Sequence, residues 1–409
     1  MCSKRISFLI VELFIFSMTI LLFTEISSIG LHSNNFFVKI YAKDTSEEFS
    51  KRNNTAAVEN QSLSPINLYR HNFNKSKLET PVINLIQNIS LSNVIGRIDH
   101  MDIDIKNHRL FVAELGNNSV GVIDLQNNGK RLDTITENIK EPQGIAYVSE
   151  YDKLFVSNGA DGKVNVFNAT SYKWIDSINF YDDADNIRYD NVSKLIYVGY
   201  GDGGIGIINA TDDKILKEIK LHSHPESFQI EKYEDAFDNK SLGNKFGNRI
   251  FVNTPGNNSI SIIDLELGIV SSKWSLGDNI HNNFPMALDQ SNHRLFVGTR
   301  DPPKLIVFDT KFMESRFGKV ISKVNISTDS DDIFYDSKNK TIYISSGQGF
   351  IDIFKQQDAN HYELYSKIPT KAGARTSLFV PELKRIYLAV PNFNTNNSSN
   401  ASILVYGYQ

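Results

Sequence analysis

The stretch from Arg249 to Asp264 reads RIFVNTPGNNSISIID. Two apolar runs flank a turn that contains Pro, Gly and two Asn, and the second run begins with apolar and polar residues in alternation. Period-two alternation predicts β-strands, and Gly and Asn tolerate the positive φ that tight turns between strands require. The stretch therefore predicts a β-hairpin.

This hairpin unit recurs along the chain. The first strand of each unit has a central aromatic residue, at Phe111, Phe155, Tyr197, Phe251, Phe296, Tyr343 and Tyr387. Successive aromatics are 44, 42, 54, 45, 47 and 44 residues apart. Seven units with a period of roughly 46 residues are typical of a propeller with four strands in each blade. We expect an all-β, seven-bladed β-propeller with four-stranded antiparallel blades.

The two ends of the repeat region predict how the ring closes. The chain stops soon after Tyr406, so the seventh unit lacks an outer strand. The apolar segment 82–89 directly precedes the first unit. We expect this N-terminal strand to pair with the last blade, because pairing removes open sheet edges that otherwise invite association. Residues 81–409 then form one domain, which we expect to be a monomer.

The first 80 residues predict export. Residues 1–5 include Lys4 and Arg5, and residues 6–23 are almost entirely apolar. About 18 residues at 1.5 Å each just span a bilayer core, and basic residues in front place the short N-terminus in the cytosol. We expect a membrane-spanning helix that anchors the protein at the cell surface. A cleaved signal peptide is the alternative, and residues 24–80 form a polar tether in either case.

Other features narrow the class of protein. Fifteen Asn-x-Ser/Thr sequons are consistent with an exported glycoprotein, although an Asn-rich chain also produces such triplets in its turns. The net charge of −4, without a dense basic block in the propeller, argues against nucleic-acid binding. Cys2 is the only cysteine, which excludes disulfides within the chain, Cys-ligated zinc and a thiol nucleophile in the propeller.

The repeats resemble the YVTN-repeat propellers, in which an aromatic-Val-x-Asn strand is followed by a turn and a Val-x-Val-Ile-Asp strand. The units that start at Phe251 and Phe111 match this pattern well, and the unit that starts at Pro142 also resembles an NHL-type repeat. The resemblance covers residues 81–409 and implies the fold. For activity it implies only a range, because these superfamilies include binding scaffolds and lactonase-like hydrolases.

Counting back from each aromatic aligns the starts of the innermost strands, which converge on the propeller axis with the loops of the same face. Six of the seven strand starts carry a charge or an amide. We expect this ring to enclose a cation, a polar ligand or ordered water. The predicted divalent-metal ligands are Glu114, Asp185, Asn186, Glu226 and Asp331. The predicted ligand-binding residues are Asp99, Gln143, Asn158, Tyr200, His224, Asp332 and Gln348.

Two functions follow from this ring. The first is a binding protein that recognises a small polar ligand or an extracellular protein partner without turnover. The second is a hydrolase resembling the lactonase-like propellers, in which Ca²⁺, Mg²⁺ or Mn²⁺ polarises an ester or lactone carbonyl or lowers the pKa of bound water. In that case His100 or a ring carboxylate with a raised pKa would move protons, and Arg300 or Arg375 would orient an anionic substrate. The sequence contains no Gly-x-Ser-x-Gly, His-Glu-x-x-His or phosphate-loop motif.

Overall fold

A computed structural model of the chain describes residues 83–232, 248–312, 314–393 and 400–408. The predicted segment 6–23 lies outside these residues, as does the predicted tether at 24–80. Within the described part of the chain, no helix is long and apolar enough to cross a membrane.

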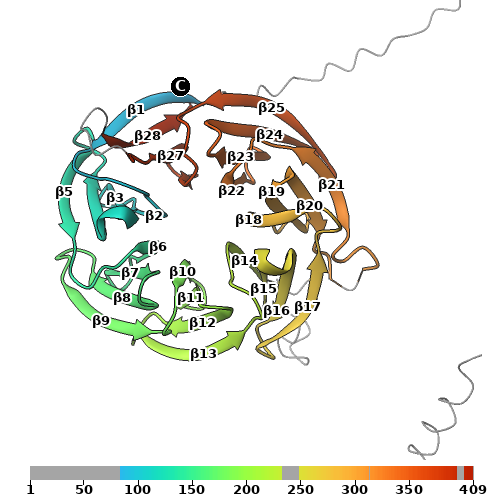
Figure 1. The fold of residues 1–409 in the computed structure, drawn as a ribbon, viewed down its shortest axis with the longest axis horizontal. Coiled ribbons are helices and arrows are strands. Elements are labelled where there is room, and N and C mark those ends of the chain that lie inside the picture. The colour runs from blue at the N-terminus through green and yellow to red at the C-terminus, as the bar shows by residue number, and fades with distance from the viewer. Residues whose placement is uncertain (1–82, 233–247, 313, 394–399, 409) are drawn as a thin grey trace, which may run out of the picture. The chain divides into compact units, whose positions relative to one another are not determined.

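The described residues form seven four-stranded antiparallel sheets arranged as a ring around an axis, which confirms the predicted all-β propeller (Figure 1). Blades 1 to 3 contain β2 (Met101–Asp104), β3 (Arg109–Glu114), β4 (Ser119–Asp124), β5 (Lys130–Ile135), β6 (Pro142–Val148), β7 (Lys153–Asn158), β8 (Lys163–Asn168), β9 (Trp174–Asn179), β10 (Ala184–Asp190), β11 (Leu195–Tyr200), β12 (Gly204–Asn209) and β13 (Lys214–Lys220). Blades 4 to 6 contain β14 (Phe228–Lys232), β15 (Asn248–Thr254), β16 (Ser259–Asp264), β17 (Ile269–Ser275), β18 (His281–Asp289), β19 (Arg294–Asp301), β20 (Pro303–Asp309), β21 (Val320–Asn325), β22 (Ser330–Asp336), β23 (Thr341–Ser346), β24 (Phe350–Asp358) and β25 (His361–Pro369).

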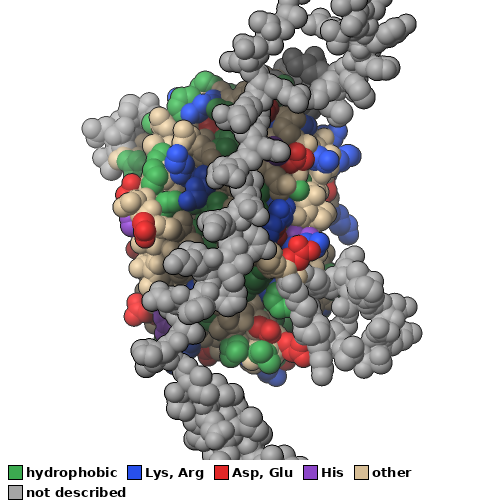
Figure 2. All heavy atoms as spheres, turned by 90° about the vertical axis from the view of Figure 1, so that its right-hand side faces the viewer, with side chains coloured by type: hydrophobic (Ala, Val, Ile, Leu, Met, Phe, Trp, Pro, Cys, Tyr) green, Lys and Arg blue, Asp and Glu red, His purple; other side chains and the backbone are tan. Residues whose placement is uncertain are grey.

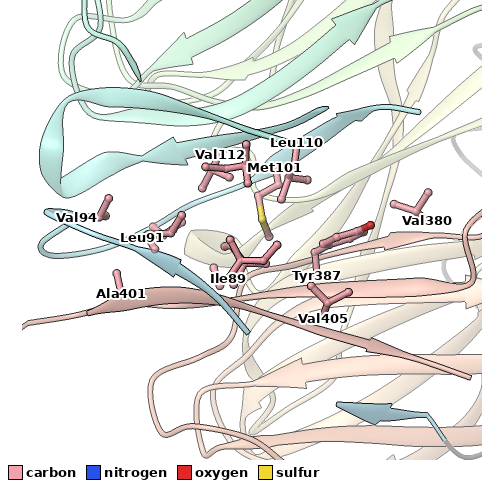
Figure 3. Close-up of a cluster of buried hydrophobic side chains, with 14 residues drawn as sticks. Ile89, Leu91, Val94, Met101, Leu110, Val112, Val380, Tyr387, Ala401 and Val405 are labelled. Atoms are coloured by element: carbon pink, nitrogen blue, oxygen red, sulfur yellow. The ribbon is translucent and has the colours of Figure 1, made fainter. Parts of the chain in front are cut away.

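The last blade combines the two ends of the described region. Its strands are β26 (Ser377–Val380), β27 (Arg385–Val390), β28 (Ala401–Gly407) and β1 (Asn84–Leu91), in that order. β1 pairs antiparallel with β28, so the paired segment ends two residues beyond the expected 82–89. Ile89 and Leu91 are buried and pack beside Met101 and Leu110 of blade 1 and Tyr387 of blade 7 (Figure 3). These apolar contacts join the first blade to the last.

Local chemistry explains the hairpins. Two short 3-10 turns, η1 (Leu115–Asn117) and η2 (Pro255–Asn257), join the second and third strands of blades 1 and 4. Each turn ends at an Asn in the left-handed region, Asn118 with φ 53° and Asn258 with φ 46°. Asn is among the few non-Gly residues that adopt this conformation readily. The paired Asn residues of the repeat therefore reverse the chain direction.

The repeated aromatics fill the interfaces between neighbouring blades. All seven are buried, and Phe111, for example, packs with Leu154 and Val156 of the next blade. Fully burying a side chain of this size contributes roughly 1.5–3 kcal/mol relative to exposure.

The outer rim of the ring carries side chains of several types. On the side of the ring that carries β21, hydrophobic, acidic and basic side chains are interspersed (Figure 2).

The basic residue that often precedes the repeated aromatic strand joins neighbouring blades. In four blades its side chain donates to a backbone carbonyl just past the third strand of the next blade. These contacts are Arg109 to Ala169 O at 2.5 Å, Lys153 to Ala210 O at 3.2 Å, Arg249 to Thr310 O at 3.3 Å and Arg294 to Ala359 O at 2.8 Å. We refer to these four as the inter-blade contacts. They lie near the residues at which the inner strands end, away from the residues at which those strands start.

Candidate functional site

The starts of the inner strands enclose a small, strongly polar cavity, which we call the axial pocket. Its lining residues are Arg97, Asp99, His100, Asp185, Asn186, Glu226, Ser227, Phe284 and Asp331. The cavity volume is about 30 Å³. A water molecule needs roughly 10–15 Å³ by the same kind of measure, so the pocket has room for one or two waters or a bare ion.

Three ligand-type side chains meet beside this pocket. Asp185 and Glu226 line it, whereas His224 does not. One atom each from Asp185, His224 and Glu226 can be chosen so that all three lie within 4.8 Å of one another. His224 Nε2 lies 3.6 Å from Asp185 Oδ2, and His224 Nδ1 lies 2.7 Å from the carbonyl oxygen of Gly201. Because that carbonyl can only accept, Nδ1 carries the proton, as is usual for a metal-ligating histidine. In the neutral imidazole, Nε2 then directs its lone pair toward the carboxylates.

The electrostatics of this group reflect its crowding. Burial raises the pKa of Glu226 above its ordinary value, and the nearby charge of Asp185 raises it further. Burial lowers the pKa of His224, but the carboxylate of Asp185 and the Gly201 carbonyl outweigh this effect and raise it. Without a metal ion, a proton shared between these groups offsets the repulsion between the two carboxylates.

Asp331 also lines the pocket, but protein groups engage its carboxylate. It accepts a hydrogen bond from Arg300 Nη2 and one from Thr376 Oγ1 at 3.0 Å, and Arg375 Nε lies 3.4 Å away. Burial raises its pKa, but the charges of Arg375 and Arg300 outweigh burial and lower it. Arg300 in turn lies 3.8 Å from the ring centre of Phe284. Arg300 and Arg375 are therefore close enough to the pocket to attract an anion.

A third set of charges surrounds His100. Its Nε2 lies 3.7 Å from Asp99 Oδ1, and its Nδ1 lies 4.0 Å from Asp332 Oδ1. Burial raises the pKa of Asp99 to about 6 and that of Asp332 to about 6. Arg97 Nη2 lies 2.7 Å from Asp99 Oδ2. The ring is thus a mixed-charge network, in which arginines and histidines compensate much of the carboxylate charge.

Nine predicted residues do not line the axial pocket. Four of them contact residues that do, namely His224, Asp332, Arg300 and Arg375. The other five engage different partners. Glu114 accepts hydrogen bonds from Ser119 and Arg131, which hold its carboxylate among the outer strands of blade 1. Asn158 donates to the Asn138 carbonyl, and Tyr200 donates to Glu218 while it stacks on Phe180. Gln348 accepts from the Thr328 amide, and Gln143 donates to Asp183. Glu114, predicted as a metal ligand on the axis, does not line the pocket, and partners on neighbouring strands engage both of its oxygens.

Other residues bring chemistry that the sequence analysis did not select. Arg97 lies two residues before Asp99, and residues two apart in extended chain point to the same side. The two-residue spacing from Asp99 could therefore have identified Arg97 as a pocket residue. Ser227 and Phe284 stand at aligned strand starts but were not chosen as site residues. Asn186 lines the pocket as predicted, and its side-chain oxygen accepts from Arg188 at 3.2 Å.

Comparisons with known proteins support the fold alone. No family model matches the chain. No curated protein matches it in sequence either. Among solved structures, a chain of hydrazine synthase from Kuenenia stuttgartiensis superposes with a TM-score of 0.60 at 17% identity, covering 77% of this chain and 97% of that one. At this identity the similarity shows a shared propeller fold.

Proposed function

We propose that this chain is an exported propeller of the YVTN type that binds a divalent cation in its axial pocket, without turnover. The observation that carries the proposal is the convergence of Asp185, His224 and Glu226 within 4.8 Å. Carboxylate oxygens suit Mn²⁺, Mg²⁺ and Ca²⁺, whereas an imidazole nitrogen suits Zn²⁺ and other transition metals. The mixed set favours Mn²⁺ or Zn²⁺ over Ca²⁺ and Mg²⁺.

Export and anchoring belong to the same proposal and rest on the apolar segment 6–23 and the sequons. We also propose that the pairing of β1 with β28 keeps the ring closed. A closed ring matters for the pocket because its lining comes from several blades that are far apart in the sequence. A cation held on the axis would add further links between blades 3 and 4, because Asp185 begins blade 3 whereas His224 and Glu226 precede blade 4.

One observation favours the hydrolase as a second candidate. Three protein ligands leave coordination positions open, as in catalytic metal sites, and His100 and Asp99 line the same pocket. The volume argues the other way. Clefts that take organic substrates measure roughly 300–1,000 Å³, whereas this cavity measures about 30 Å³. Binding of an ion therefore fits the pocket better than binding of a lactone.

Metal-dependent stabilisation of the purified full-length protein tests the proposal. After treatment with EDTA and removal of the chelator, addition of Mn²⁺ or Zn²⁺ at millimolar concentration should raise Tm by a few degrees. Glu226→Gln and Asp185→Asn should each abolish this gain. The matched control is Asp331→Asn, which should retain it, because arginines and Thr376 already occupy that carboxylate.

Absence of any metal-dependent shift would refute the cation site. An equal loss of the gain in Asp331→Asn would mean that the ligand set is wrong. Turnover of a lactone or ester panel by the metal-loaded protein, lost in His100→Gln, would favour the hydrolase instead.

A further inference from the structure

The structure separates the sequons by accessibility. Nine Asn-x-Ser/Thr triplets lie entirely within the described residues, at Asn88, Asn117, Asn168, Asn191, Asn209, Asn257, Asn325, Asn339 and Asn400. In the triplet 191–193 all three residues are exposed, whereas each of the other eight contains at least one residue that is half-buried or buried. A sugar attached to asparagine is bulky and hydrophilic, so it has to lie on the surface. Among these nine triplets, 191–193 is therefore the most accessible.

The turn that carries this triplet joins β10 to β11 in blade 3. Asp190 holds the turn in shape, because its carboxylate accepts from the Val192 amide at 3.0 Å and from Ser193 Oγ at 2.6 Å. The Lys194 amide donates to the Asp190 carbonyl oxygen at 2.9 Å. Within the described part of the chain, the Asn191 side chain forms no hydrogen bond. The turn therefore keeps its shape without the Asn191 amide, which is exposed to solvent.

Two other sequons use their asparagine to hold the chain. In the equivalent turn of blade 6, Asn339 Nδ2 donates to Asp336 Oδ2 at 2.7 Å. Asn168 Nδ2 donates to Asp152 Oδ2 at 3.0 Å, and Asn168 Oδ1 accepts from the Ser171 amide at 2.7 Å. Both asparagines are half-buried. A sugar would replace one of the two hydrogens on Nδ2 and would crowd the carboxylate beside it.

Space and position also suit Asn191. It lines a cavity of about 250 Å³ at the end of β10, so a sugar on its amide would meet open space. The axial pocket lies at the other end of β10, where Asp185 and Asn186 line it. We propose that Asn191 carries an N-linked glycan, whereas Asn168 and Asn339 carry none. The inference rests on the proposed export, because Asn-x-Ser/Thr triplets are glycosylation acceptors in secreted proteins.

The modification is a group transfer from a lipid-linked sugar phosphate. A bond forms between Asn191 Nδ2 and C1 of the first sugar, and the bond between that C1 and a phosphate oxygen of the donor breaks. The amide gives up one proton to solvent, and the lipid phosphate leaves with the electron pair of the broken bond. Ser193 supplies the hydroxyl that an acceptor triplet requires at its third position.

Glycopeptide mass spectrometry of the full-length protein from its native cells tests the assignment. The peptide that contains Asn191 should carry the mass of a glycan, and the peptides that contain Asn168 and Asn339 should be unmodified. Protease treatment of intact cells reports export separately, with lysed cells as the control for cleavage. An exported protein with an unmodified Asn191 would overturn this inference and leave export standing. A protein that is cleaved only after lysis and carries no glycan would overturn both.

Variants produced in the same cells locate the glycan. Asn191→Gln and Ser193→Ala should each lower the apparent mass on a denaturing gel by one glycan. Ser193→Thr retains the acceptor triplet and should keep the mass of the parent protein. Asn339→Gln is the control at a second sequon and should also leave the mass unchanged. An unchanged mass in Asn191→Gln, or a lower mass in Asn339→Gln, would overturn the assignment.

Discussion

The axial pocket and the inter-blade contacts use the same types of side chain, arginines and carboxylates, in opposite ways. At the inter-blade contacts, Arg109 has its own carboxylate in Asp104 and a carbonyl of the next blade to bind. In the axial pocket, several carboxylates crowd together, and Arg300 and Arg375 share Asp329 and Asp331. Satisfied pairs hold blades together. Crowded like charges leave unmet interactions, which a bound ion can satisfy.

The largest expected effect of a single change falls on the inter-blade contacts. Arg109→Met should lower the free energy of unfolding by about 3 kcal/mol, because it leaves the buried Asp104 without its cation. Chemical denaturation of the full-length protein measures this loss. Arg375→Met is the matched change at the axial pocket and should cost less than about 1 kcal/mol, since Arg300 remains beside Asp331. Equal losses would contradict the contrast.

A smaller effect is expected from Asp332 and depends on pH. Its pKa is raised by burial from 3.8 to about 6. The folded state therefore favours the protonated form, and stability declines as pH rises from about 4 to about 6. Asp332→Asn should flatten this decline and stabilise the protein at pH 7 by on the order of 1 kcal/mol. Thermal melts across this pH range test it.

Asp104 provides the opposite case as a control. Burial raises its pKa, but hydrogen bonds from Asn107 and Arg109 outweigh burial and lower it below 3.8. Its stabilising contribution is present above pH 4 and is lost as pH falls through the depressed pKa. Asp104→Asn should therefore destabilise at neutral pH, and the difference from the parent protein should shrink in acid. The same sign for both variants at pH 7 would contradict the comparison.

The smallest effect is expected at an exposed pair on the rim. Lys194 forms an ion pair with Glu150, and both side chains are about two-fifths exposed. Lys194→Gln should change the free energy of unfolding by less than about 0.5 kcal/mol. Lys153 instead donates to the Ala210 and Thr211 carbonyls and to Asp213, so Lys153→Gln should cost more, roughly 1–2 kcal/mol. Urea titrations of the two variants provide the comparison.

The sequence located pocket-lining residues correctly where their position at the start of a strand was sufficient to place them. Counting back from the buried aromatics located Asp99, Asp185, Glu226 and Asp331, all of which line the axial pocket. Glu114 was assigned from the loops of the same face and not from the strand starts, and it does not line the pocket. There Arg131, from an outer strand of the same blade, engages its carboxylate. The spacing along a strand predicts the backbone position of a residue, but the contacts of its side chain determine where the charged group lies.

By itself the sequence determined the number of blades, their order and the hairpin turns, because these depend on local alternation and on residues such as Asn118 and Asn258 that permit positive φ. Only the tertiary structure decided which charges meet. His224, in the segment that precedes blade 4, faces Asp185 of blade 3, and Arg109 reaches Ala169, 60 residues away. Such pairings leave no local signal, because they arise only when seven separately formed sheets close around one axis.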